Sequence, residues 1–184
     1  MKIVLKIMAV LVLIACFTNA LMAQTGSGIS APNTAGVKLI VPMSLSKTAA
    51  LDFGTLILTN ATGGTCTMAS TGADRTVTGG VKTTTVAPIA TNAAYNVTGT
   101  ASSNYALTVP GTITVTNTVI SGQTMDITAI TARFANKSGA DDTKSTLDLD
   151  GKDSFTLGGT LTIKANQAGG VYSAANFDVS IDYN

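Results

Sequence analysis

Apolar and polar residues alternate along much of the chain, most regularly over residues 177–184. Four apolar residues in that stretch are separated by single polar ones: Phe177, Val179, Ile181 and Tyr183. Successive side chains of a strand point to opposite faces, so this spacing predicts one face on a core and one in water. We therefore expect residues 177–184 to form a strand whose four apolar side chains belong to the core.

The same alternation predicts further strands throughout the chain after residue 36, where no segment has a convincing helical stripe. Residues 155–163 alternate without interruption. In residues 125–134 the apolar positions change from odd to even numbers, which predicts a β-bulge near Ala129. About nine or ten short strands, separated by Gly-, Pro- and Asn-rich turns, predict a single all-β domain: an antiparallel, immunoglobulin-like sandwich.

Residues 37–45 also alternate, and their apolar members are Val37, Leu39, Val41, Met43 and Leu45. They follow residues 24–36, whose Gly, Ser, Thr and Asn content is typical of a flexible leader. Such a segment is either donated to the sheet of a neighbouring subunit or forms the first strand of its own closed sandwich. The scarcity of apolar residues in the leader favours the second interpretation.

The first residues have the composition of a secretory signal. Lys2 and Lys6 precede an apolar run over residues 7–17, which is too short to span a bilayer. We expect cleavage after Ala23, which makes residues 1–23 a signal peptide and leaves no transmembrane span.

Two alternatives at this end stay open. Cleavage after Ala20 is the second candidate, and residues 13–16 resemble a lipobox in which Cys16 would be acylated. In each case we expect a leader over residues 24–36 and a β-sandwich domain over residues 37–184. We also expect export through the periplasm to the cell surface or the medium.

Composition narrows the chemistry that the chain can carry. There is no His, Glu or Trp, so the commonest general base and metal ligand is missing. A Ser-His-Asp or Cys-His site is therefore excluded, and we expect no enzyme activity, cofactor or metal. The 11 Lys and Arg residues are balanced by 10 acidic ones and form no basic stripe, which disfavours a nucleic-acid partner.

Two short motifs fit a structural role better than a chemical one. Cys66 is the single cysteine after the expected signal, so we expect a small buried side chain and no disulfide or thiolate zinc site. Asp148, Asp150 and Asp153 have the close spacing of calcium-binding carboxylates, but they miss the EF-hand pattern. Asp150 with Gly151 is typical of a tight hairpin turn.

Several motifs occur together in one order: Leu51-Asp52-Phe53-Gly54-Thr55, residues 75–81, residues 95–99, residues 105–110 and the long tail over residues 155–183. This ordered set resembles a bacterial family of secreted proteins classed as a domain of unknown function, DUF4402, over residues 37–184. The resemblance implies a pilin-like, immunoglobulin-like β-sandwich exported to the periplasm or cell surface, with a role in fimbriae or adhesion. It implies no catalytic residues.

Two functional hypotheses follow. The first is a structural subunit of a fimbria-like or adhesive layer, which pairs by strands with other copies, related subunits or a periplasmic chaperone. The second is a monomeric surface module that binds a protein or a carbohydrate through its loops. The few aromatic residues disfavour a sugar site, because Trp is absent and only four Tyr remain.

Overall fold

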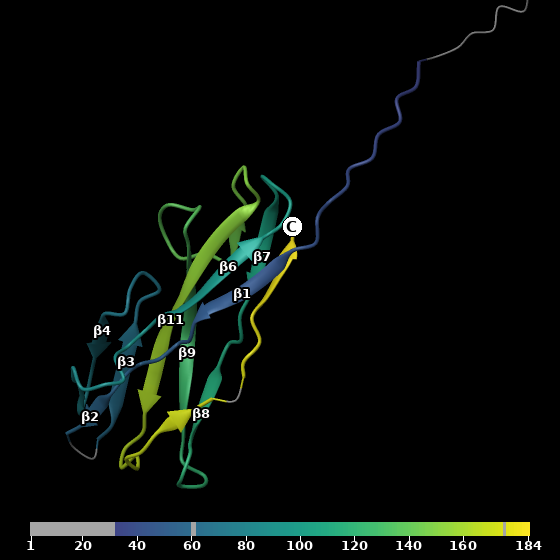
Figure 1. Ribbon diagram of the computed structural model, residues 1–184. Helices are drawn as coiled ribbons and strands as arrows, with labels where there is room; N and C mark the ends of the chain where they lie inside the picture. The colour runs from purple at the N-terminus through teal and green to yellow at the C-terminus, as the bar shows by residue number, and fades with distance from the viewer. Residues whose placement is uncertain (1–31, 60–61, 175) are drawn as a thin grey trace, which may run out of the picture. The chain divides into compact units, whose positions relative to one another are not determined.

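The computed structural model describes residues 32–59, 62–174 and 176–184 of the 184-residue chain. The signal-peptide and lipidation predictions, including Ala20, Ala23 and Cys16, lie outside these residues. The chain divides into two units, residues 1–38 and residues 39–184, and the strands belong to the second (Figure 1). Within the described residues, no helix is long and apolar enough to cross a membrane.

The strands are, in chain order, β1 (Ser44–Ala49), β2 (Leu56–Leu58), β3 (Gly64–Met68), β4 (Arg75–Val77), β5 (Val81–Thr83), β6 (Ala93–Thr98), β7 (Asn104–Thr108), β8 (Ile113–Asn117), β9 (Thr124–Phe134), β10 (Lys144–Thr146), β11 (Lys152–Ile163), β12 (Tyr172–Ser173) and β13 (Ser180–Tyr183). The largest sheet has the order β1-β6-β11-β9-β8-β12, with β3 beside β11 and β4 beside β3. The other sheets are β10-β7-β13 and β2-β5. Every strand pair is antiparallel, which confirms the all-β prediction.

β11 is the central strand of the fold (Figure 1). One of its edges pairs with β9, and the other pairs first with β6 and then with β3. Gly158 lies where the partner changes, and a Cβ there would come within 2.3 Å of the Met68 carbonyl oxygen. Glycine is therefore required for the close approach of the two backbones.

Two hydrophobic cores lie along β11. The buried residues of core 1 are Ala93, Tyr95, Val97, Tyr105, Leu107, Ala132, Phe134, Leu147, Phe155 and Leu157. Those of core 2 are Phe53, Cys66, Met68, Val81, Ile113, Met125, Ile127, Leu161 and Ile163. Alternate side chains of β11 enter the two cores. The buried face of this strand is therefore the apolar face that its sequence pattern predicts.

Cys66 is fully buried in core 2, as predicted. Burial raises the pKa of its thiol, and the charge of Arg75 offsets part of that rise. The thiol is therefore a small apolar packing group at neutral pH.

The predicted bulge in β9 is confirmed. Thr128 lies opposite Thr160 and Thr131 lies opposite Gly158, so two residues of β9 face one residue of β11. Ala129, within the bulge, has a positive φ of 49°. Before the bulge, the odd-numbered residues Met125 and Ile127 face core 2. After the extra residue, the even-numbered residues Ala132 and Phe134 face core 1, so the apolar side chains of both halves of β9 are buried.

The predicted strand over residues 37–45 is wrong for most of its length, because β1 begins only at Ser44. Pro42 has no backbone N–H to give to a sheet. The N–H of Val41 donates to the Thr100 hydroxyl, 2.7 Å away, rather than to a strand. The alternation of apolar and polar residues gives no sign of this hydrogen bond, which takes the place of strand pairing at Val41.

Residues 51–58 and 81–89 form strands over only short parts of their lengths, β2 and β5. Asp52 forms only an isolated bridge with Thr91, and its carboxylate accepts the N–H of Gly54 at 2.7 Å. Gly54 has a φ of 65°, which turns the chain before β2. Only the two short strands of the β2-β5 sheet remain of these segments.

Candidate strand-edge interface

β13 forms one border of the β10-β7-β13 sheet. It pairs with β7 from Ser180 opposite Thr108 to Tyr183 opposite Tyr105. Among the described residues, no strand pairs with its other edge. The sequence places this strand correctly but makes it too long, because residues 176–179 form no strand.

The direction of the β13 backbone groups follows from two hydrogen bonds. The N–H of Asn184 donates to the Asn104 carbonyl at 3.1 Å, whereas the N–H of Leu107 donates away from β13, toward the chain before β10. Paired and unpaired positions alternate along an antiparallel ladder. Ile181, opposite Leu107, and Tyr183 therefore direct their backbone N–H and C=O groups to the free edge.

The side chains around β13 alternate as predicted. Val179, Ile181 and Tyr183 pack against core 1, and Phe177 packs against core 2. The polar residues between them are exposed. All four apolar residues thus face a core, but each is only half-buried, unlike the buried residues of β11.

β1 forms the border of the other sheet that flanks core 1 (Figure 1). In the described part of the chain it pairs only with β6. The half-buried apolar residues of core 1 gather at these two borders and their flanks: Met43, Leu45, Leu51, Val109, Val179, Ile181 and Tyr183. We call the side of core 1 between the free edges of β1 and β13 the open side.

A hydrogen-bonded clamp joins the two borders at one end. The Tyr183 hydroxyl donates to the Val41 carbonyl at 2.6 Å and accepts the N–H of Thr100 at 2.7 Å. Gly99 makes room for it, because a Cβ at Gly99 would lie 2.5 Å from the Tyr183 hydroxyl oxygen. The clamp was not predicted, since a Tyr at a core position of a strand gives no sign of its hydroxyl partner.

The five residues that the sequence suggests for strand donation differ in their surroundings on the two sides of the clamp. Met43 and Leu45 pack against core 1 of their own domain. Val41 has both backbone groups engaged in the clamp. Val37 and Leu39, by contrast, are 94% and 90% exposed. Of these five residues, Val37 and Leu39 are therefore the two that remain free to pair elsewhere.

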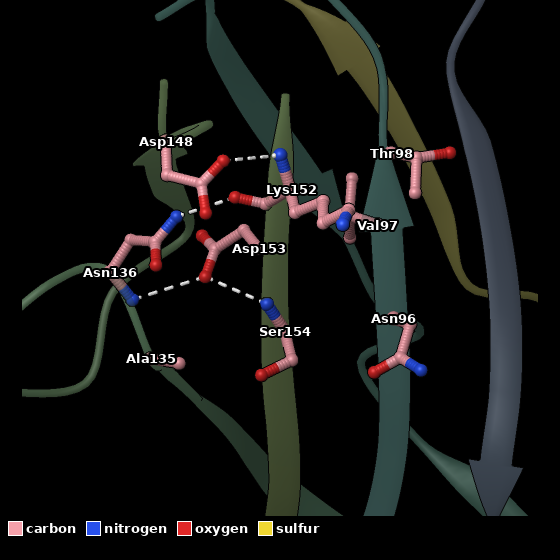
Figure 2. Close-up of a pocket in the computed structure, with 9 residues that line it drawn as sticks. All are labelled: Asn96, Val97, Thr98, Ala135, Asn136, Asp148, Lys152, Asp153 and Ser154. Carbon is pink, nitrogen blue, oxygen red and sulfur yellow. Dashed lines mark hydrogen bonds between the residues drawn. The ribbon is translucent and has the colours of Figure 1, made fainter. Parts of the chain in front are cut away.

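A polar hollow of about 430 Å³ lies at the start of β11 (Figure 2). It is lined by Asn96, Val97, Thr98, Ala135, Asn136, Asp148, Lys152, Asp153 and Ser154. The backbone N–H groups of Asn136 and Ser154 donate to one oxygen of the buried Asp153 carboxylate at 3.0 and 2.7 Å. No aromatic side chain lines it, so a sugar ring would find no surface for stacking.

The other oxygen of Asp153 accepts the Tyr105 hydroxyl at 2.9 Å and the Ser145 hydroxyl at 2.6 Å. Burial raises the pKa of Tyr105, and the neighbouring carboxylate raises it further, so the phenol stays a donor. Four donors thus satisfy this carboxylate inside the fold. The network holds β7, β10 and β11 together and leaves no oxygen of Asp153 unpartnered.

Asp148 is engaged in the turn between β10 and β11, which is not a hairpin because the two strands belong to different sheets. Its carboxylate accepts the N–H groups of Asp150 and Lys152 at 2.9 and 2.7 Å, and Gly151 has a φ of 73°. The tight turn predicted from Asp150 and Gly151 is confirmed. Among the described residues, no three His, Cys, Asp or Glu side chains come together as metal ligands.

Asp141 ties the polar loop after β9 to the sheet. Its carboxylate accepts the Ser70 hydroxyl at 2.5 Å and pairs with the Arg133 guanidinium at 3.1 Å. Partial burial raises the pKa of this carboxyl, but hydrogen bonds from Ser70, Thr131 and Arg133 outweigh it, and the net pKa lies below the ordinary value. This arrangement stabilises the loop.

A protein-family model with the description "Domain of unknown function (DUF4402)" matches residues 43–183. No curated protein and no solved structure matches the chain. The matched range begins at Met43, where the chain enters core 1, and ends at Tyr183 of the clamp. It therefore includes both strands that border the open side.

Proposed function

Given that this chain belongs to the DUF4402 family, we propose that it is an exported structural subunit of a fimbria-like or adhesive surface layer. Its partners are other copies or related subunits, with a periplasmic chaperone during assembly. The contact is backbone pairing at a free strand edge. One observation carries the proposal: among the described residues, β1 and β13 each have an unpaired edge beside a hydrophobic core that is only half-covered there.

A free edge above apolar side chains is a template for pairing with another chain. At β13 the backbone groups of Ile181 and Tyr183 point outward, and the side chains of the same two residues enter core 1. An added strand would gain backbone hydrogen bonds and would also cover apolar surface. Both contributions favour assembly over a purely polar encounter.

The carboxylates of the domain support a structural role. Asp153 and Asp148 accept hydrogen bonds from the fold itself, and Asp141 is engaged by Ser70 and Arg133. Without His or Glu in the sequence, all ten side-chain carboxylates that could serve in acid–base chemistry are Asp, and these are three of them. Each has a packing or loop-fixing role, so the proposal includes no catalytic activity.

The test is the state of the protein on the cells that make it. We expect immunogold labelling of the cell surface and extraction of high-mass assemblies that give monomers when unfolded. Protein that is found only inside the cell, or only as monomers at every concentration, would contradict the proposal. A deletion of residues 24–40 is the matched control for the leader, because it leaves the β1 residues Ser44 and Leu45 in place.

A further inference from the structure

We infer that the free edge of β13 receives residues 33–40 of a second copy of this chain, as an added strand that covers the open side of core 1. This inference rests on the proposed function and names its acceptor edge and its donor. Three independent observations support it: the order of the strands, the burial of core 1 and the exposure of Leu39.

The strand order has a vacant position. An immunoglobulin-like sandwich has strands in the order A-B-E-D in one sheet and C-F-G in the other, lettered in chain order. Here β1-β6-β11-β9 corresponds to A-B-E-D, and β7-β13 corresponds to C-F. The G position is the free edge of β13. Within residues 32–59, 62–174 and 176–184, no strand occupies it.

Burial points to the same position. Core 1 is fully buried where β6, β7, β9 and β11 meet, but Val179, Ile181 and Tyr183 on one border and Met43 and Leu45 on the other are half-buried. A strand beside β13 would lie over these residues. The missing coverage is therefore on the side where the strand order lacks a strand.

The apolar alternation of residues 33–40 and the exposure of Leu39 identify the donor segment. Ala35, Val37 and Leu39 share one face of an extended chain, and Lys38 and Ile40 share the other. Leu39 is 90% exposed within the unit of residues 39–184, so it does not rest on β13 of its own copy. The clamp holds the chain from Val41 onward, which leaves residues 33–40 available to a neighbour.

The first test compares two charges on opposite faces of the donor. We expect the full chain to associate in light scattering as its concentration rises. Leu39→Asp should weaken association by at least about tenfold, because it buries a carboxylate without a partner. Ile40→Asp, the matched control, should change it by less than about twofold. Equal effects of both variants, or none from Leu39→Asp, would overturn the assigned donor.

The second test identifies the acceptor by disulfide cross-linking. Lys38→Cys chains are mixed with Asp182→Cys chains or, as a control, with Thr162→Cys chains. All three positions are exposed, and Thr162 lies on β11, whose two edges are both paired. We expect mixed dimers with Asp182→Cys and few with Thr162→Cys. Native Cys66 is buried and should not react.

The outcomes separate this inference from the proposed function. Assemblies that persist in Leu39→Asp without cross-linking at Asp182 would refute the inference and leave the structural role standing. A disulfide within one chain of the double variant Lys38→Cys/Asp182→Cys, with no mixed dimers, would mean that the donor folds back on its own copy and would also refute it. Monomers under all conditions would refute both proposals.

Discussion

β11 and β13 have similar sequence patterns and opposite surroundings. Both alternate apolar and polar residues, and both direct their apolar side chains to a core. β11 has partners along both edges, and Leu157 is fully buried. In the part of the chain that the structure describes, β13 has one partner strand, and Ile181 is only half-buried. Alternation therefore shows which face is apolar, whereas the pairing of the neighbouring strands determines whether that face is sealed.

The largest expected difference between these strands is in amide hydrogen exchange. In the monomer, central β11 amides should exchange only on global unfolding, which requires about 5 kcal/mol or more. The amides of Ile181 and Tyr183 should exchange much faster, because they face the free edge. Ser180 and Asp182, directed to β7, are the control and should be slower. Equal protection at all four β13 positions would disprove the free edge.

Leu157→Ala should be the most destabilising of the substitutions compared here. The side chain is fully buried in core 1, and its removal leaves a cavity that long paired strands cannot close. We expect a loss of about 3–5 kcal/mol in the free energy of unfolding, measured by urea denaturation. A loss below about 1 kcal/mol would show that β11 is not the rigid centre of the fold.

Ile181→Ala removes a similar volume from the half-covered strand. Because Ile181 is already partly in water, the expected loss is about 1–2 kcal/mol in the same measurement. The difference from Leu157→Ala is the quantity of interest. An equal loss of stability for Ile181→Ala and Leu157→Ala in the monomer would show that the open side of core 1 is covered, and would contradict the free edge of β13.

Tyr183→Phe removes the clamp hydroxyl and keeps the ring. It leaves the Thr100 N–H without its partner and removes the shorter of the two hydrogen bonds that the Val41 carbonyl accepts, so we expect a loss of about 1 kcal/mol. The Thr100 amide should also exchange faster. Tyr172→Phe is the matched control, because its hydroxyl contacts only nearby residues, Gln167 and Ala168. An effect in the control as large as in Tyr183→Phe would contradict a bridging role for the clamp.

The smallest effect concerns pH. The pKa of Asp141 is lower in the folded state than in the unfolded chain, so the unfolded chain binds more protons in acid. Its stabilising contribution is therefore present above the ordinary Asp pKa and is lost as pH falls through the folded pKa. For a partly exposed pair we expect less than about 1 kcal/mol. Asp141→Asn should reduce the acid dependence of unfolding, and an unchanged pH profile would contradict this assignment.

Much of the fold could be predicted from local pattern. The faces of β11 and β13, the bulge at Ala129 and the Asp150-Gly151 turn follow from side-chain period and turn chemistry. These features depend on residues that are close in sequence. The first strand was predicted too early because Pro42 and the distant Thr100 determine where β1 begins.

The candidate interface was predictable only in part. The sequence identifies Val37 and Leu39 as apolar residues after a leader, but it cannot show that Met43 and Leu45 already belong to their own core. The free edge of β13 is a property of strand order, which depends on contacts across the whole chain. The donors to Asp153 are likewise brought together from three strands and a loop.

The double role of β11 also sets the order in which the protein can fold during synthesis. β3 pairs with nearby β4, but its other partner, β11, lies about a hundred residues further along the chain, with Cys66 opposite Leu161. β6 likewise pairs with β11 as well as with β1. Such long-range pairing makes folding slow, because the chain loses the entropy of closing a large loop before the contacts between these strands stabilise it. Because β11 supplies buried side chains to both cores, neither core is complete before β11 has been synthesised.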